Sequence, residues 1–223
     1  MRFSLALVAL TTACSTVHGV RPVGRGVVEV DASLGGPVTE LFGAPVPLPL
    51  TTVGATVGVS DRTNVHAAVH PTALALFGLV AADVGASTQL LAQEGARPRL
   101  MGDLTVMGAG GDVAEGGSEG GFRAFARPTV TASWDWGRDR RSTVYGALGA
   151  FVEPWPGPHA VGTVAVGNLW ALGPHHLTTQ VEWIAPYASS APLAPHYYAP
   201  GDMGAISVQV GLGVRAFAPA GAP

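Results

Sequence analysis

Residues 205–215 read AISVQVGLGVR, and this stretch decides the fold of the chain. Every second residue from Ile206 to Val214 is a large aliphatic one, whereas Ser, Gln and Gly stand between them. Successive side chains of a β-strand point to opposite sides, so this period of two predicts a strand with one apolar face and one face of small or polar groups.

The same alternation recurs along the chain and predicts about ten strands, most of them near the roughly 9–11 residues that a strand needs to cross a bilayer at a tilt. We therefore expect an all-β fold, an antiparallel up-and-down transmembrane β-barrel. Eight strands are the alternative count, because 143–153 and 159–171 are strand-like in composition but alternate poorly and 64–91 is ambiguous. The expected strands are 27–35, 51–60, 64–70, 80–90, 99–107, 123–136, 143–153, 159–171, 176–187 and 205–215.

The links between these strands largely alternate between short and long. Asp61–Thr63 and Gly173–His175 are short and polar, whereas 35–49, 108–122 and 188–203 are long. Outer-membrane barrels have short periplasmic turns and longer outer loops, and an even strand count puts both ends of the barrel on the periplasmic side.

Composition narrows the function classes. Only 12% of the 223 residues are charged, the net charge is −3, and all twelve basic residues are Arg. No basic stripe is present, so we expect no nucleic-acid partner. Mean hydropathy is +0.33, yet no run of about 18 apolar residues could form a transmembrane helix. A single Cys excludes an internal disulfide.

The first residues are typical of an export signal: Arg2 is followed by the apolar run Leu5–Leu10 and by Cys14. They resemble a bacterial lipoprotein signal, which implies cleavage before Cys14 and lipidation of that residue. Cleavage after Gly19 is the alternative. The expected organisation is a signal peptide at 1–19, a short linker at 20–25, the barrel at 26–217 and a Pro/Ala tail at 218–223.

Over residues 26–217 the pattern resembles small bacterial outer-membrane β-barrel proteins. The resemblance implies an outer-membrane location, contact with outer-membrane lipid and insertion by the barrel assembly machinery. Such proteins often end on a strand with an aromatic last residue, and Gly204–Phe217 looks like that strand, although Phe217 is out of phase with the apolar face. Other aromatic residues near expected strand ends are Trp134, Trp136, Trp170, Phe151, Trp155 and Tyr187.

The inward face of such a barrel would carry charged groups, and buried charges have to be paired. We therefore expect a network of salt bridges and hydrogen bonds that plugs the lumen and gives the barrel a structural role. A narrow polar pore with a transport role is the alternative. The expected lumen residues are Glu29, Asp31, His66, Asp83, Asp103, Arg123, Arg127, Asp135, Glu182 and Arg215.

No motif predicts catalysis, a cofactor or a metal. His66 and His70 have H-x3-H spacing, but on a strand they stand about 13 Å apart, too far for one ion. The sequence has no nucleophile elbow and no P-loop. We expect a protein that is not an enzyme. The sequence pattern predicts neither a transported solute nor a partner that the loops would bind.

A lipid-anchored soluble periplasmic β-barrel or β-sandwich binding protein is the alternative from another class. A soluble barrel keeps its apolar face inside and its charges outside. With 12% charged residues the outer face would be poorly charged for a soluble protein, which favours the membrane form.

Overall fold

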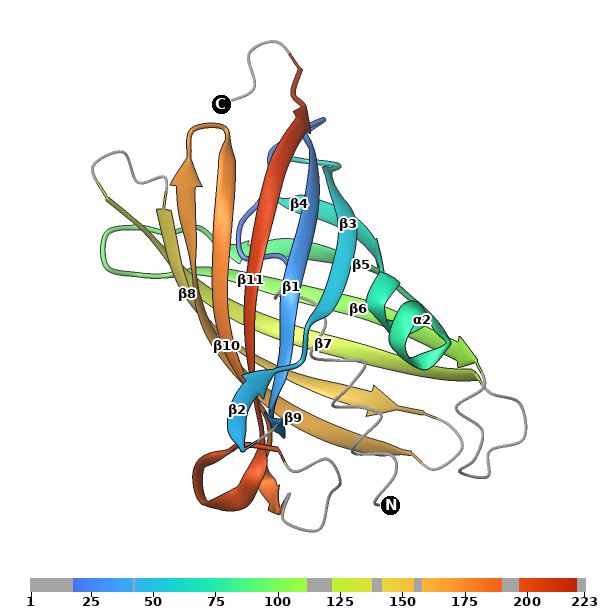
Figure 1. The fold of residues 1–223 in the computed structure, drawn as a ribbon. Helices are drawn as coiled ribbons and strands as arrows, with labels where there is room; N and C mark the ends of the chain where they lie inside the picture. Colours follow the sequence, from blue (N-terminus) through green and yellow to red (C-terminus); the bar gives the residue numbers. More distant parts are fainter. Residues whose placement is uncertain are drawn as a thin grey trace.

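The computed structural model of the protein describes residues 18–41, 43–111, 122–137, 142–154, 158–189 and 197–219. Within these ranges the chain forms a closed β-barrel (Figure 1). The ten strands of the ring are β1 (Val28–Leu41), β3 (Leu50–Gly58), β4 (Thr63–Val69), β5 (Leu79–Leu91), β6 (Arg99–Gly111), β7 (Phe122–Trp136), β8 (Ser142–Glu153), β9 (His159–Leu172), β10 (His175–Ser189) and β11 (Met203–Phe217).

Each strand of the ring pairs antiparallel with the next, and β11 closes the barrel against β1. The closing register runs from Glu29 opposite Arg215 to Pro37 opposite Ser207. The predicted antiparallel up-and-down barrel is therefore confirmed with ten strands rather than eight. Each strand that the alternation predicts is present, including the two whose alternation is poor.

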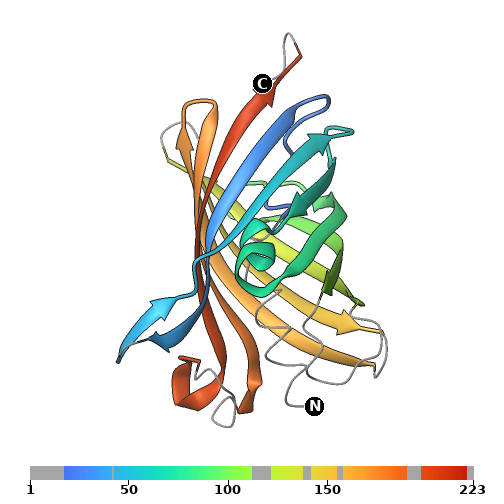
Figure 2. The same ribbon diagram turned by 45° about the vertical axis from the view of Figure 1, so that its right-hand side comes forward.

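The structure contains three short elements that the sequence pattern does not predict. β2 (Ala44–Pro47) pairs with the end of β1 and projects beyond the ring (Figure 2). The helix α2 (Pro71–Phe77) begins on a proline and ends at Gly78, whose φ of 65° suits glycine. η2 (Pro200–Asp202) precedes β11. None of the helices in the described ranges has the length and apolar character that crossing a membrane would take.

The two ends of the barrel differ. β1 starts and β11 finishes at the same end, which is uppermost in Figure 1 and which we call the turn end. Its links are short, with β9 and β10 joined by Gly173–Pro174 alone. The opposite end, which we call the loop end, carries β2, α2 and the longer connections between β6 and β7 and between β10 and β11.

The strands turn apolar side chains outward and polar side chains inward. In β11, Val208 is 36% and Val210 is 47% exposed, whereas the alternate residues Ser207 and Gln209 are buried. The other strands repeat this arrangement: Val53 and Val130 are exposed on the outside. The distribution is the reverse of a soluble barrel, which packs its apolar face inside.

An irregularity in strand pairing explains why Phe217 is out of phase with the apolar face of β11. The register of β1 against β11 shifts between Val28 and Glu29, whose partners are Phe217 and Arg215. One residue of β11 is therefore left over, as in a β-bulge, and the phase of the strand changes there. Phe217 is 59% exposed and joins the apolar outer surface, while Phe151 is buried and points into the lumen instead of lying on the outer surface.

Candidate lumen site

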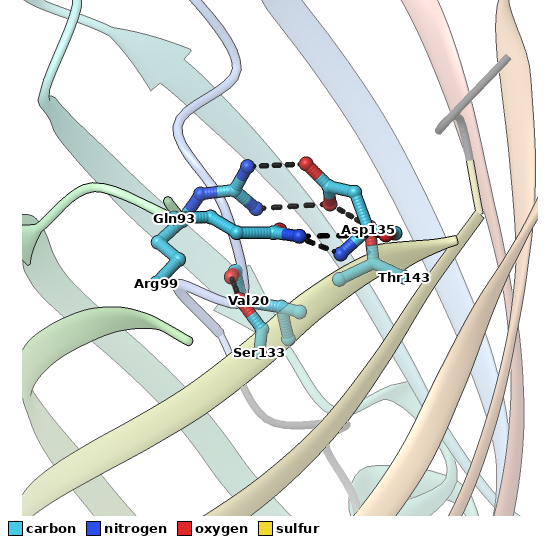
Figure 3. A network of polar contacts seen from close by, with 6 residues as sticks. All are labelled: Val20, Gln93, Arg99, Ser133, Asp135 and Thr143. Atoms are coloured by element: carbon cyan, nitrogen blue, oxygen red, sulfur yellow. Dashed lines mark hydrogen bonds and ion pairs between the residues drawn. The ribbon is translucent and has the colours of Figure 1, made fainter. Parts of the chain in front are cut away.

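A hydrogen-bonded ion pair joins two neighbouring strands on the inner side of the wall at the turn end. Both terminal guanidinium nitrogens of Arg99, on β6, donate to the carboxylate of Asp135, on β7. Thr143 donates to the same carboxylate over 2.8 Å, and the side-chain oxygen of Gln93 accepts from the backbone N–H of Asp135 over 2.7 Å (Figure 3). A bidentate pair of this kind fixes both side chains in position.

The middle of the lumen holds a second ion pair. Arg127 on β7 donates to the carboxylate of Glu182 on β10 over 2.6 Å, and the Glu182 side chain is fully buried. The guanidinium of Arg127 also lies 4.7 Å from the centre of the Phe151 ring. A buried charge pair costs desolvation and is retained only with such close partners.

The loop end of the lumen combines ions with apolar groups. Glu153 is buried and lies 2.9 Å from the guanidinium of Arg123 and 3.3 Å from the ring of His159. Beside it the inner faces of several strands pack large side chains together, so this end of the interior is filled by an apolar cluster. The cluster consists of Met107, Phe125, Phe151, Val161, Ile184 and Ala185.

Two buried histidines, His66 in β4 and His70 directly after it, face the lumen and bind different partners. The ring of His70 hydrogen-bonds to Asp83 over 3.0 Å and to Thr52 over 3.3 Å. The ring of His66 hydrogen-bonds to Thr105 over 3.0 Å. The two histidines therefore do not converge on one point, as the strand spacing predicts.

The residues that precede β1 lie inside the barrel. The side-chain amide of Asn64 accepts from the backbone N–H of Val23 and donates to the backbone carbonyl of Arg21, each over 3.1 Å. Nearer the turn end, the backbone of Gly26 donates to the carbonyl of Gly58 over 2.7 Å, and Gly58 donates to Val27 over 3.0 Å. We call residues 18–27 the inner segment.

Further contacts hold the inner segment against the wall. Val20 packs in an apolar cluster with Tyr145 and Leu169, and its carbonyl accepts from the hydroxyl of Ser133 over 3.0 Å (Figure 3). The ring of His18 stacks on that of His66, with the centres 4.2 Å apart. The segment expected to be a short linker, 20–25, is thus built into the interior.

The interior around Arg21 is polar and partly hollow. Burial lowers the pKa of the Arg21 guanidinium, and the nearby carboxylates of Glu29 and Asp135 oppose that shift. A cavity of about 70 Å³ lies between the inner segment and the wall, with Glu29, Asp31 and His176 among its lining residues. That volume has room for a few water molecules.

Of the ten residues expected in the lumen, five are buried and five are partly buried. The buried ones are Glu29, His66, Asp83, Arg127 and Glu182, and the partly buried ones are Asp31, Asp103, Arg123, Asp135 and Arg215. The structure brings together Arg127 with Glu182, and it brings Asp103 within 3.8 Å of His66. Other partners were not among the expected residues. Alternation alone could have found three of these partners, because Arg99 and Glu153 have the parity of the inward residues of their strands and His70 continues the parity of β4. It could not have found His18 and Arg21, which lie outside any strand.

Some expectations fall on residues that the structure does not describe. Cys14 and the rest of 1–17 are among these, as are Trp155 and 220–223. The signal peptide, its cleavage site and the lipidation of Cys14 therefore stay predictions.

The chain matches no protein-family model and no curated protein. Among solved structures, the translocator domain of the autotransporter NalP from Neisseria meningitidis is similar, with 11% sequence identity and a TM-score of 0.45. That similarity covers 96% of this chain and 93% of the other. What the protein does has to be inferred from its own residues.

Proposed function

We propose that the protein is a bacterial outer-membrane β-barrel whose ten strands cross the bilayer and whose lumen is closed by its own inner segment and side chains. Its role in this proposal is structural, with no catalytic step. The observation that carries the proposal is the inside-out distribution of side chains: aliphatic groups cover the outside, and ionised groups lie within.

The outer surface supports contact with lipid. Exposed aliphatic residues lie on every strand of the ring, and in water they would form an apolar surface far larger than a soluble monomer carries. A bilayer removes that surface from water, and the closed ring leaves no backbone edge to hydrocarbon. Examples, one from each strand, are Leu34, Val53, Val65, Val84, Leu104, Val130, Leu148, Val166, Val181 and Val210.

Aromatic residues at both ends of the barrel also support a position across the bilayer. Trp136 and Trp170 are about 40% exposed at the turn end, and their rings meet edge to face with centres 5.6 Å apart. Phe122 and Tyr187 are more than half exposed at the loop end. Aromatic rings of this kind lie at the two membrane interfaces of outer-membrane barrels.

The filled interior supports a closed lumen at rest. The inner segment is hydrogen-bonded to Asn64, Ser133 and Gly58, and the ion pair of Arg127 with Glu182 also crosses the interior. A closed lumen disfavours the narrow-pore alternative, which would need a continuous polar path. Export by a signal peptide cleaved before Cys14, lipidation there, and insertion by the barrel assembly machinery complete the proposal.

Heat-modifiable migration tests the membrane barrel. The protein extracted in detergent should migrate faster on a gel before boiling than after, and it should float with lipid vesicles through alkaline washing. A soluble lipid-anchored barrel would instead leave the vesicles once its acyl anchor is removed, which a Cys14→Ala variant tests. Release of that variant into the aqueous fraction would contradict the proposal.

Planar bilayers test the closed lumen. We expect the intact protein to give no steady current, and a variant lacking residues 18–25 to give small current steps. Arg97→Ala is the matched control, because Arg97 pairs with Glu94 at the exposed turn end and should leave the bilayer silent. Steady conductance from the intact protein would favour the narrow pore.

A further inference from the structure

Three groups that ligate metals converge in the middle of the lumen. His18 of the inner segment, His66 of β4 and Asp83 of β5 each offer one ligand atom, and these three atoms lie within 4.8 Å of one another. His66 and Asp83 are 3% and 4% exposed. The group thus joins the inner segment to two neighbouring strands of the wall.

The hydrogen bonds around His66 leave one ring nitrogen with a free lone pair. The hydroxyl of Thr105 donates its only hydrogen to Asp103 over 2.8 Å, so toward His66 it accepts. The Nε2 of His66 must then carry the hydrogen, and Nδ1 has the lone pair. Among the described residues this buried Nδ1 has no hydrogen-bond partner. A free imidazole lone pair is what a metal ion binds.

Asp83 is arranged in a similar way. The Nε2 of His70 hydrogen-bonds to Oδ2 of Asp83 over 3.0 Å, and the Nδ1 of His70 hydrogen-bonds to the hydroxyl of Thr52. The second oxygen, Oδ1, is buried and lacks a hydrogen-bond partner within the described part of the chain. A carboxylate held at one oxygen by a histidine leaves the other oxygen oriented for a cation.

The Nε2 of His18 is the third such atom, buried and without a hydrogen-bond partner in the ranges that the structure describes. Each unpaired buried polar atom costs free energy, so a common partner for these three atoms would recover part of that cost. Gly85 leaves room for the ring of His66, since a Cβ there would lie 2.4 Å from its Nε2. The position of the ring is therefore set by the wall.

We propose that His18, His66 and Asp83 bind one divalent transition-metal ion, which fastens the inner segment to the barrel wall. Two imidazoles and a carboxylate suit Zn²⁺ and neighbouring ions better than Ca²⁺ or Mg²⁺, which prefer oxygen alone. Asp103, 3.8 Å from His66, adds negative charge beside the site. The strand pattern does not predict this site, because His18 lies outside any strand.

Binding requires a small closure of the site. Bonds of about 2.0–2.1 Å to a tetrahedral ion put its ligand atoms about 3.3 Å apart, closer than the 4.8 Å limit observed. His18 makes the movement, because it belongs to the inner segment and is followed by Gly19, whereas His66 and Asp83 are held by Thr105 and His70. Its ring also tilts away from its nearly parallel stack on His66.

Metal binding by the detergent-folded protein tests the proposal. After treatment with a chelator, removal of the chelator, incubation with Zn²⁺ and desalting, we expect the protein to retain one Zn²⁺ per chain, counted by elemental analysis. Zn²⁺ should also raise the temperature of unfolding, because it binds the folded state alone. Co²⁺ in its place should give the visible absorption of a tetrahedral site.

Three variants and one control locate the site. His18→Ala, His66→Ala and Asp83→Asn should each weaken Zn²⁺ binding at least about tenfold. His159→Ala should bind as the wild type does, because His159 lies at the loop end beside Glu153. Heat-modifiable migration shows whether each variant folds, and His18→Ala is decisive, since it alters no strand.

Several results would overturn the proposal. These are a folded protein that retains no Zn²⁺, a His18→Ala variant that binds as tightly as the wild type, and a mature chain that begins after His18. All are read in detergent, so they do not depend on whether the barrel conducts or spans a membrane. A failure of the proposed membrane function would therefore not affect the metal-binding result. A failure to bind metal would likewise not affect the proposed membrane function.

Discussion

At the scale of single residues, Arg127 and Glu182 form a buried ion pair across the lumen. Both side chains are buried, their charged atoms are 2.6 Å apart, and Arg127 also stacks over Phe151. The pair joins β7 to β10 across the interior, whereas these strands are not neighbours in the ring. It therefore resists distortion of the barrel cross-section in a way that the strand pairing alone does not.

Arg127→Met should destabilise the folded barrel by about 3–5 kcal/mol, because it leaves the buried carboxylate of Glu182 without its counter-ion. The measurement is denaturant unfolding of the detergent-folded protein, with the free energy extrapolated to water. The double variant Arg127→Met with Glu182→Leu is the control and should recover most of the loss, since no charge is then left unpaired. A double variant as unstable as the single one would contradict this account.

Alternation predicted which strand residues point inward, because side-chain direction on a strand depends on parity alone. Asp103 and Arg127 lie on the inner side for that reason. Pairing could not be predicted in the same way: it depends on which strands face each other across the ring. Arg127 shows the difference, because its partner Glu182 lies 55 positions later in the sequence, on β10, which is not a neighbour of β7 in the ring.

At the scale of elements, the seam between β1 and β11 completes the ring. Gly35 of β1 lies there between Leu50 of β3 and Gln209 of β11. Its φ is +142°, and a Cβ at this position would lie 2.1 Å from the carbonyl oxygen of Val208. Only glycine permits both the backbone angle and the approach of the two strands.

Gly35→Ala should therefore weaken the seam, at a cost of about 1–3 kcal/mol for the strained backbone. We expect the variant to convert to the slow-migrating form on a gel after heating to a lower temperature than the wild type needs. Gly146→Ala in β8 is the matched control, because the nearest atom to its new methyl is the Ala165 carbonyl at 3.9 Å. Equal loss in both variants would show that the seam has no special role.

Element prediction was weakest where the inner face is apolar. In β8 the inward residues include Tyr145, Ala147 and Phe151, and in β9 they include Val161 and Ala165, so both faces of these strands are hydrophobic. Hydrophobic alternation fades under that condition although the backbone is still a strand. The inner segment escaped prediction for another reason: its contacts are set by tertiary structure.

At the scale of the whole molecule, the barrel is a polar interior enclosed by an apolar wall. Val210 is the middle residue of β11, and its side chain is 47% exposed on the outer surface. Phe217 ends the same strand and is 59% exposed at the turn end. If lipid covers this wall, a charge should cost more at Val210 than at Phe217, although both sites are similarly exposed.

Val210→Arg should destabilise the protein folded in lipid vesicles by about 2–4 kcal/mol, while Phe217→Arg should cost about 0–1 kcal/mol from the charge itself. The reason is depth: an arginine at the bilayer centre has no water within easy reach, whereas one at the interface extends into it. Urea unfolding of both variants in vesicles gives the two values. A soluble barrel would tolerate arginine equally at these two exposed sites, so a Val210→Arg variant as stable as the wild type would mean that this surface faces water.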